Sequence, residues 1–349
     1  MRPDSAARLA AVATAAKQWQ DPEFVPRAKA VQATLGAPNR FTEEALAFAV
    51  NQQMHQLGSP KKLCAWQRES STTGVPVGII PEGAVPLDGV RALVATWLAG
   101  HQPVVRPPAS SPHLLQAFAE SVEAEGGAVA RFAVDDAEAL ALSEALVLPG
   151  ALEIAETWRA LASEAGVAPE RVYARLRRLT IAVIDGTEDF DTRIRLAEDM
   201  LLHEGLSEAN VALLWAPVGL DADPLFEALS GFRQVMPAHP DTEGVLEMPR
   251  AFLKAAKQPY AWGDGVLVSR GEPDVQTAGH VRWVSYATPD EVVAWTTAHR
   301  HQLGGVVATE AVAARVAISD DLRVEPGEAH RARLGSPADH ALMAFLSNV

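Results

Sequence analysis

The sequence predicts an α/β protein built from two doubly wound domains. Residues 74–112 have the pattern of a strand, a helix and a second strand, and the alternation of strands with helices continues to residue 184. After residue 191 the alternation starts again and runs to residue 307. Regular alternation of this kind predicts parallel sheets covered by helices on both faces.

The first unit is bounded by proline and glycine. The run 75–80 is a short, mostly apolar strand, and the loop 81–86 ends it. The stretch 87–99 has apolar residues at helical spacing and ends before Gly100. A second strand begins at Val104 and ends before a proline pair, so the unit is a βαβ crossover with parallel strands.

The other elements follow in order. Helices are expected at 6–20 and 42–57, the second opened by Thr42. In 232–263 four prolines recur and periodicity fades, so this stretch is predicted to be rich in loops. The further predicted helices are 113–124, 135–144, 152–165, 191–203, 224–229 and 289–299, and the further strands are 128–132, 145–148, 179–184, 211–215, 265–268, 281–284 and 305–307.

Composition excludes several classes of partner. With 349 residues the chain suits two domains, and 48% hydrophobic residues can form a sizeable core. The net charge of −14 argues against a nucleic-acid or anionic-membrane partner, because both would repel the chain. Cys64 is the single cysteine, which excludes an internal disulfide framework and a multi-cysteine zinc site.

The compartment predicted from the sequence is the cytoplasm. The apolar stretch 9–16 is short and rich in alanine, whereas a signal peptide needs a more hydrophobic segment. No apolar run reaches the length of a membrane span.

Three motifs of the first unit carry a family resemblance: PEGAVP at 81–86, LAGH at 98–101 and VVRP at 104–107. In order and identity they resemble the start of the cofactor domain of the aldehyde dehydrogenase superfamily, most of all the bacterial fatty-acyl-CoA reductases of the LuxC type. The segments 148–153, 187–191 and 326–335 continue the resemblance, so it covers nearly the whole chain.

The resemblance implies an aldehyde-dehydrogenase-like fold with two domains. Residues 1–190, joined by 326–349, would form the cofactor-binding-type α/β domain with a helical N-terminus. Residues 191–325 would form the catalytic-type α/β domain.

The chemistry that the resemblance implies is incomplete. Enzymes of this superfamily that reduce acyl thioesters use a cysteine thiolate to capture the acyl group, and an asparagine amide helps to hold the oxyanion. The position of that cysteine, before the strand 211–215, is Gly205, and the position of the asparagine is Ala84. Where the dehydrogenases have a glutamate base, the nearest residues are 175–178, with the sequence Arg-Leu-Arg-Arg. The resemblance therefore implies a degenerate catalytic site.

Two other side chains, those of Ser207 and Cys64, are the remaining candidates for a nucleophile. Ser207 and His203 flank the vacant position, and they could form a pair for acyl transfer or hydrolysis, although Ser and His at a helix end are typical capping residues. Cys64 lies beside Leu63 and Trp66 and is predicted to be a buried, inert small hydrophobe.

The histidines do not predict a metal site. His299 and His301 would face nearly opposite sides of a helix end, and His330 and His340 are predicted to lie on the surface.

Two residues could contribute to a nucleotide-binding site. Arg106 stands at the position of the family's lysine and could meet the ribose or the 2′-phosphate of NAD or NADP. Gly150, before the helix 152–165, could bring helix N–H groups near a phosphate. The polar residues that usually follow the lysine are replaced here by Pro107, Pro108 and Ala109.

The leading functional prediction is a catalytically degenerate acyl-CoA reductase homologue that binds an acyl thioester, a nucleotide or a partner protein. One alternative is an active NAD(P)H-dependent acyl-CoA reductase that forms an aldehyde. Another is a scaffold reused for acyl transfer or hydrolysis by Ser207 and His203. The family resemblance also implies a homodimer or a pairing with a related protein.

Overall fold

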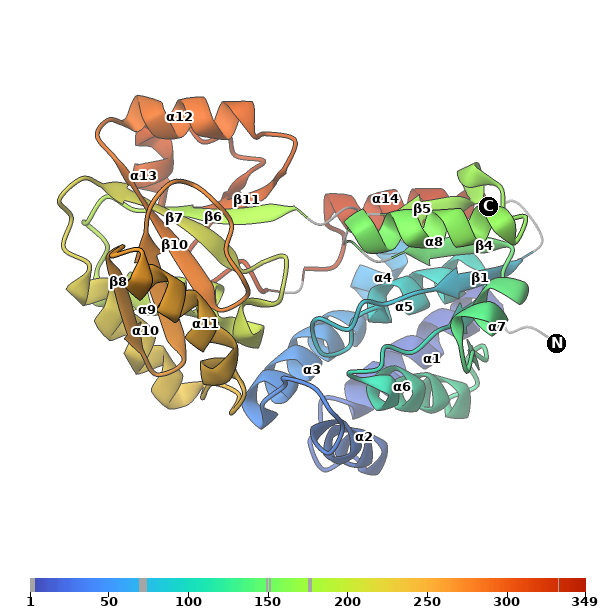
Figure 1. Ribbon diagram of the computed structural model, residues 1–349. Helices are drawn as coiled ribbons and strands as arrows, with labels where there is room; N and C mark the ends of the chain where they lie inside the picture. The colour runs from blue at the N-terminus through green and yellow to red at the C-terminus, as the bar shows by residue number, and fades with distance from the viewer. Residues whose placement is uncertain (1–3, 69–73, 149, 151, 175–177, 332) are drawn as a thin grey trace. The chain divides into compact units, whose positions relative to one another are not determined.

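The computed structural model describes residues 4–68, 74–148, 150, 152–174, 178–331 and 333–349. The contacts between Cα atoms divide the chain into two units. Unit 1 comprises Met1–Arg177 and Ala332–Val349, and unit 2 comprises Arg178–Arg331. Figure 1 labels their helices and strands.

Unit 1 contains a five-stranded parallel sheet in the order β3-β2-β1-β4-β5. The middle strand aligns Ile79 with Val105 on one side and with Val147 on the other, so the loops that follow these strands leave the same edge. The strands are β1 (Pro76–Ile79), β2 (Gln102–Val105), β3 (Arg131–Phe132), β4 (Ala145–Leu148) and β5 (Val172–Ala174).

Helices cover both faces of this sheet because apolar side chains alternate along each strand. Ile79 and Val147 pack with α1, α3–α6 and α14, whereas Ile80 and Leu146 pack with α7 and α8. The helices are α1 (Ser5–Gln18), α2 (Val25–Leu35), α3 (Glu43–Leu57), α4 (Pro60–Trp66), α5 (Val90–Ala99), α6 (Pro112–Ala124), α7 (Asp136–Ala141), α8 (Leu152–Glu164) and α14 (Pro337–Ser347), with the 3₁₀ turn η1 (Pro169–Arg171) before β5.

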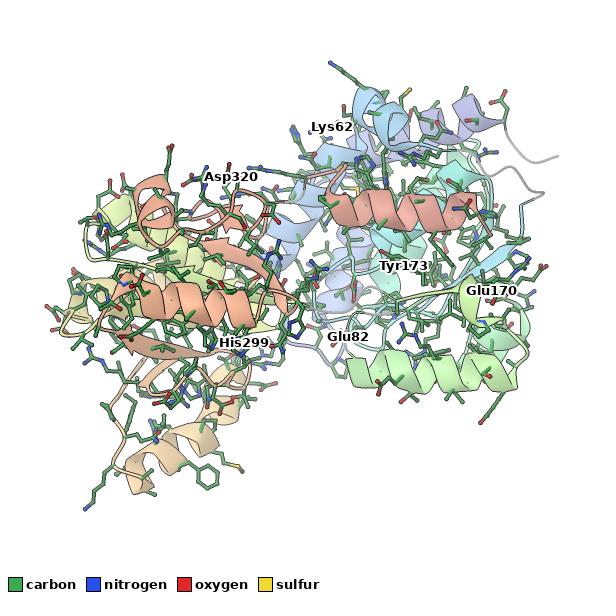
Figure 2. All side chains as sticks on the ribbon, turned by 90° about the horizontal axis from the view of Figure 1, so that it is seen from above. Lys62, Glu82, Glu170, Tyr173, His299 and Asp320 are labelled. Carbon is green, nitrogen blue, oxygen red and sulfur yellow. The ribbon has the colours of Figure 1, made fainter. Side chains whose placement is uncertain are left out.

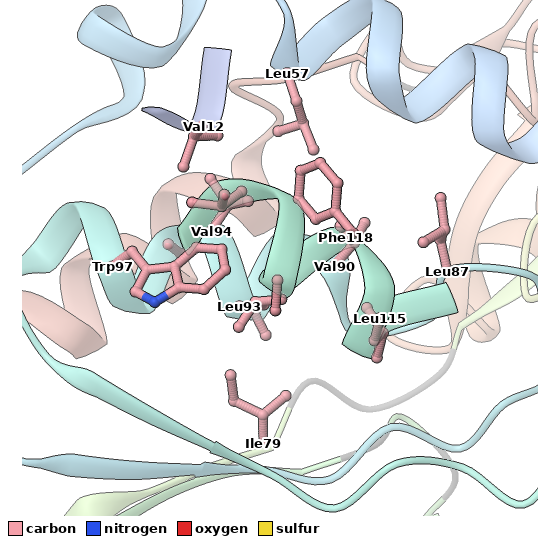
Figure 3. Close-up of a cluster of buried hydrophobic side chains, with 14 of the residues drawn as sticks. Val12, Leu57, Ile79, Leu87, Val90, Leu93, Val94, Trp97, Leu115 and Phe118 are labelled. Atoms are coloured by element: carbon pink, nitrogen blue, oxygen red, sulfur yellow. The ribbon is translucent and has the colours of Figure 1, made fainter. Parts of the chain in front are cut away.

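Helix α5 lies at the centre of unit 1. Leu93 and Trp97 are fully buried between the sheet, represented by Ile79, and the outer helices, represented by Val12 and Leu57 (Figure 3). Apolar residues all round a helix are typical of such a position.

The start of α5 differs from the sequence prediction. The helix was expected from Leu87, but Leu87 and Gly89 both have left-handed backbone angles, φ 58° and 87°. The first helical turn therefore forms only from Val90. Leu87 is buried beside the helix although it does not belong to it.

The C-terminal helix α14 belongs to unit 1. Leu342, Met343 and Leu346 are buried in the same core as α5. Trp66 Nε1 donates a hydrogen bond to the Asp339 carbonyl at 2.9 Å, and the guanidinium of Arg91 pairs with the Asp339 carboxylate at 2.8 Å. Figure 2 shows this helix beside Tyr173, whose ring centroid lies 5.3 Å from that of Phe345 on α14.

Unit 2 contains a seven-stranded sheet in the order β12-β11-β6-β7-β10-β9-β8. All neighbouring strands are parallel except β8, which runs antiparallel to β9 at one edge. The strands are β6 (Leu179–Val183), β7 (Val211–Pro217), β8 (Tyr260–Gly263), β9 (Val266–Arg270), β10 (His280–Tyr286), β11 (Leu303–Val307) and β12 (Arg323–Val324).

The boundary between the units lies before β6. From the sequence, 179–184 were expected in the first domain, with a boundary at residue 190. Strand β6 instead pairs with β7 on one side and with β11 on the other, and both of these strands belong to unit 2. The return to unit 1 follows Arg331 rather than residue 325.

The helices of unit 2 also lie on both faces of their sheet. Helices α9 and α10 pack on the face that carries Leu214 and Trp283, and α12 and α13 on the face that carries Leu213 and Val306. The helices are α9 (Phe190–Leu201), α10 (Asp223–Val235), α11 (Thr242–Ala255), α12 (Pro289–Ala298) and α13 (Glu310–Arg315), with the 3₁₀ turn η2 (Leu202–Gly205) after α9.

The prediction of a loop-rich region at 232–263 was wrong. Helix α10 extends to Val235, and α11 and the strand β8 fill most of the rest. Helix α11 packs Leu246 and Leu253 against Leu267 of β9 but also has exposed apolar residues. Two apolar faces and an internal proline at 249 conceal the helical period in the sequence.

None of the helices in the described part of the chain combines the length and apolarity needed to span a membrane.

Candidate functional site

The chain reverses sharply at the position predicted for a nucleophile. Helix α9 ends at Leu201, and η2 then leads toward the amino end of β7. His203, Glu204 and Gly205 all have left-handed backbone angles, with φ of 54°, 57° and 72°. Such conformations are unfavourable for residues other than glycine and persist only where the surrounding structure holds them.

Gly205 lies against the backbone of another segment. A β-carbon built on Gly205 would stand 2.4 Å from the amide nitrogen and 3.1 Å from the α-carbon of Gly279. Since backbone atoms have nowhere to rotate, any side chain at 205 requires the two segments to move apart. The position has no nucleophile, and it has no space for the β-carbon of one.

Asn210 organises the turn between α9 and β7. Its side-chain amide lies within 3.2 Å of the carbonyl oxygens of Asp199 and Met200 in the last turn of α9 and of Leu202 at the start of η2. Its side-chain oxygen accepts a hydrogen bond from Ser207 N at 2.9 Å. This role was not predicted from the sequence, although an asparagine between a helix end and a strand is typical of a turn.

Ser207 and His203 have surroundings that suit structural roles. Ser207 Oγ accepts a hydrogen bond from Ala209 N at 3.1 Å, which closes a local turn. His203 is buried, and burial lowers the pKa of its imidazole to about 4. The imidazole is therefore neutral at pH 7 and a weak base, which suits neither general-base catalysis nor ion pairing.

Glu204 forms a buried ion pair that the sequence analysis did not identify. Its carboxylate lies 2.9 Å from the Arg233 guanidinium, and each side chain is only 4% exposed. The hydroxyl of Thr242 donates a hydrogen bond to the other carboxylate oxygen. The pair links η2 to α10 and α11, so this turn is tied to the unit by charge as well as by packing.

Asp199 anchors the loop 326–331. Its carboxylate accepts hydrogen bonds from Gly327 N at 2.6 Å and from Ala329 N at 3.1 Å. Burial raises the pKa of this carboxyl to about 7, although the two backbone donors act in the opposite direction. The neighbouring Glu198 pairs with Arg331 at 2.9 Å.

His330, predicted to lie on the surface, is half-buried. Its ring centroid lies 5.6 Å from that of His203, and its Nε2 is 3.2 Å from the side-chain nitrogen of Asn210. Burial, together with the neighbouring His203, lowers the pKa of His330 to about 3. The prediction was wrong because the loop that carries His330 folds back onto the end of α9.

A buried serine and histidine lie next to Gly279, the residue that the Gly205 turn contacts. His280 follows Gly279, and its Nε2 lies 2.7 Å from Ser269 Oγ on the neighbouring strand β9. Both residues are buried, and burial lowers the pKa of His280 to about 4, with the charge of Arg282 acting in the same direction. Because Ser269 is 0% exposed, this pair is part of the core of unit 2.

The candidate nucleotide residues Arg106 and Gly150 lie in unit 1, as does Ala84, which stands at the position predicted for the oxyanion asparagine. Ala84, Arg106 and Gly150 follow β1, β2 and β4, which are adjacent and parallel, so all three leave the carboxyl edge of one sheet. Figure 2 labels Glu82 in the first of these loops. The loops after β1 and β2 touch, since Ser110 Oγ donates to the Gly83 carbonyl at 2.8 Å.

Arg106 has a carboxylate partner. Its Nε lies 2.7 Å from Asp136 at the start of α7, and the two side chains are 34% and 49% exposed. Residues 149 and 151 beside Gly150 lie outside the described residues, as do Arg175, Leu176 and Arg177.

Cys64 is exposed, which corrects the prediction that it is buried. On the short helix α4, Leu63 and Trp66 point into the core of unit 1, and Cys64 falls on the opposite side. In the described part of the chain, no group of three or more His, Cys, Asp or Glu side chains is placed to hold a metal ion.

The comparisons with known proteins identify the fold. No protein-family model matches the sequence, and no curated protein matches it significantly. Solved structures do match: a Marinobacter aquaeolei oxidoreductase has a TM-score of 0.71 at 13% identity, over 94% of this chain and 79% of its own. A Corynebacterium glutamicum NAD-dependent benzaldehyde dehydrogenase has a TM-score of 0.70 at 14% identity, over 97% and 83%.

A third match is AldA, an indole-3-acetaldehyde dehydrogenase of P. syringae solved as a mutant with NAD⁺ and IAA, with a TM-score of 0.69 at 14% identity over 93% of this chain and 77% of its own. The chain has the fold of the aldehyde dehydrogenase superfamily, and the predicted fold class, with two α/β domains, is confirmed.

Proposed function

We propose that this protein is a homologue of the LuxC-type acyl-CoA reductases that has lost covalent catalysis and acts by binding an acyl thioester, a nucleotide or a partner protein. One observation carries the proposal: the predicted nucleophile position is a left-handed glycine whose missing β-carbon would overlap the backbone of Gly279. Without a thiolate, an acyl group cannot be transferred to the protein there.

The other candidate nucleophiles support the same conclusion. Cys64 is an exposed residue of a seven-residue helix in unit 1, with Lys61 and Lys62 beside it in the sequence. Ser207 is engaged in a local turn, and the low pKa of His203 makes that imidazole a poor base. Ser269 has a histidine partner but no exposed surface.

Nucleotide binding belongs to the proposal because the residues fit its chemistry. Arg106 and Asp136 supply a cation and an acceptor at the carboxyl edge of a parallel sheet, where this class of sheet binds nucleotides. A carboxylate suits ribose hydroxyls, whereas a guanidinium suits a 2′-phosphate. If a nicotinamide dinucleotide is bound, it supplies hydride chemistry, and these residues hold its ribose.

The test of the proposal is a reduction assay with full-length protein. We expect no consumption of NADH or NADPH with acyl-CoA esters of short, medium or long chain, and no acyl adduct in the intact mass. The Cys64→Ala variant controls for modification of the exposed thiol. Reduction that survives Cys64→Ala would establish an active reductase, and an adduct on serine would establish acyl transfer; either result refutes the proposal.

Binding is measured separately by calorimetry with an acyl-CoA ester, NAD⁺ and NADP⁺. Binding of one of them without turnover supports the ligand-binding form of the proposal. If none binds, the protein-partner form remains, and a homodimer is its simplest case.

A further inference from the structure

Residues 326–331, which we call the strap, cross the end of helix α9. They come shortly after β12, a two-residue strand at the edge of the sheet, and they are the last residues of unit 2. A β-carbon built on Gly327 would stand 2.9 Å from the β-carbon of Arg195, so the backbone of the strap lies directly on α9. The strap is therefore packed closely on the unit, although it begins at a strand that has a neighbour on one side only.

One carboxyl group holds the strap in place. The backbone amides of Gly327 and Ala329 donate hydrogen bonds to the side-chain oxygens of Asp199 at 2.6 and 3.1 Å. Arg331 also pairs with Glu198 at 2.9 Å, but this arginine is 33% exposed, so solvent screens part of the attraction. Asp199, which is 0% exposed, is therefore the main anchor.

The strap covers part of the turn that contains Gly205. Nε2 of His330 lies 3.2 Å from the side-chain nitrogen of Asn210, which organises this turn. The ring of His330 also packs against that of His203, with the centroids 5.6 Å apart. If the strap lifts from α9, Asp199 and the Asn210 amide become accessible to water.

We propose that the strap is a latch, which Asp199 fastens to α9 and which opens without unfolding of the rest of unit 2. Two features favour local opening. The strap begins at a short edge strand, and its main anchor is a buried carboxyl group that water solvates in the open state. The inference goes beyond the proposed function, because the latch operates whether or not a thioester or a nucleotide binds.

The closed latch keeps its buried groups uncharged. Burial raises the pKa of Asp199 to about 7 and lowers the pKa of His330 to about 3 and that of His203 to about 4. In the open state Asp199 and His330 return toward their ordinary pKa values of 3.8 and 6.5. Between these two values, opening therefore releases a proton from Asp199 and adds one to His330.

Other charged groups also face this anchor. Burial raises the pKa of Glu198 as well, so this carboxyl acts in the same direction as Asp199. The charged side chains around Asp199 and the strap, besides the histidines, are Arg195 and Glu198 of α9 and Glu328 and Arg331 of the strap. Because several groups titrate together, the contribution of each is measured as a difference between a variant and the wild type at the same pH.

Hydrogen exchange of the full-length protein tests the latch. Peptides that contain residues 326–331 should exchange through an opening that low concentrations of urea leave unchanged, whereas β7 at the centre of the sheet should exchange through an opening that urea promotes. Asp199→Ala should raise the exchange rate of the strap at least about tenfold more than that of β7, since it removes both acceptors. Asp320→Asn, at an exposed carboxylate of unit 2, is the matched control and should change neither rate.

The two titrating groups provide a test that a purely structural contact would not pass. Relative to the wild type, Asp199→Asn should open the strap increasingly as pH falls from 6.5 toward 3.8, by up to about tenfold per pH unit. His330→Gln should open it increasingly as pH rises over the same range. Strap exchange that follows urea as β7 does, that Asp199→Ala leaves unchanged, or that has the same pH dependence in both variants overturns the inference.

Discussion

Gly205 and Gly279 are in backbone contact, and the space between them cannot hold a β-carbon. The contact joins the turn after α9 to the loop before β10. Three successive left-handed residues and a buried ion pair hold the same turn. The position predicted for the nucleophile is therefore held in a tight turn, and a cysteine introduced there would have to displace the Gly279 backbone.

The first prediction concerns this contact. The strained backbone angle alone is expected to cost about 1–3 kcal/mol. Gly205→Ala should lower the free energy of unfolding by more than this amount, because the β-carbon also meets the Gly279 backbone. Gly219→Ala is the matched control, because Gly219 has φ 82° and no atom within 4 Å of a built β-carbon. Urea unfolding followed by tryptophan fluorescence measures both variants. Equal losses would show that the Gly279 contact adds no energy.

The second prediction concerns the buried pair of Glu204 and Arg233. Arg233→Met leaves a buried carboxylate without its cation and should destabilise the protein by about 3–5 kcal/mol. Adding Glu204→Gln removes that charge and keeps a hydrogen-bonding partner for Thr242. The double variant should therefore be more stable than Arg233→Met alone. The pair is not a coupled unit if the two losses simply add in a double-mutant cycle.

The third prediction concerns pH. The pKa of His280 is lowered to about 4 by burial, below the ordinary value of 6.5. Between these values the unfolded chain binds more protons than the folded one, so stability rises as pH rises from about 4 to 6.5 and is lost in acid. His280→Gln, which can still pair with Ser269, should flatten this dependence by up to about 1.4 kcal/mol per pH unit.

Asp199 provides a control of opposite sign. Burial raises the pKa of its carboxyl to about 7. Its contribution to the stability of the fold is therefore complete below the pKa of the unfolded chain and is lost as pH rises through about 7. Asp199→Asn should therefore make the increase of stability between pH 4 and 6.5 steeper. Urea midpoints across this range measure both variants, and an unchanged slope in His280→Gln would contradict the third prediction.

The fourth prediction concerns nucleotide preference. Asp136 lies 2.7 Å from Arg106, and its negative charge opposes a 2′-phosphate. Asp136→Asn should strengthen binding of NADP⁺ relative to NAD⁺, because it removes that charge and frees the guanidinium. The control is Asp320→Asn, which removes an exposed carboxylate of unit 2. The neighbouring Asp135 is not used as a control, because its side chain caps α7. An unchanged ratio of the two affinities would remove Arg106 from the nucleotide site.

The sequence was sufficient for the fold because the strands are short apolar runs and the helices between them are amphipathic. The boundaries that it missed have local physical causes. Leu87 was counted into α5 although its left-handed backbone excludes it, and β6 was assigned to the wrong sheet because an apolar strand does not reveal its neighbours. Helix α11 was missed because Pro249 interrupts it and apolar residues occupy two of its faces.

The site was less predictable, since its residues interact through backbone groups and burial. The position of Gly205 followed from a resemblance, but its contact with Gly279 joins segments far apart in the sequence. The pairing of Glu204 with Arg233 spans the strand β7 and most of α10. Cys64 was predicted to be buried from its apolar neighbours, whereas the helical phase of Leu63 and Trp66 determines its exposure.

Helix α14 also determines the order in which the chain can fold during synthesis. Leu342, Met343 and Leu346 complete the core around α5, and Asp339 binds Arg91 and Trp66. A ribosome delivers these residues only after all of unit 2 has emerged. Unit 2 can complete its sheet from one continuous segment. The core of unit 1 stays incomplete until α14 has been synthesised. Until translation reaches α14, a nascent chain therefore carries an apolar surface that chaperones can recognise.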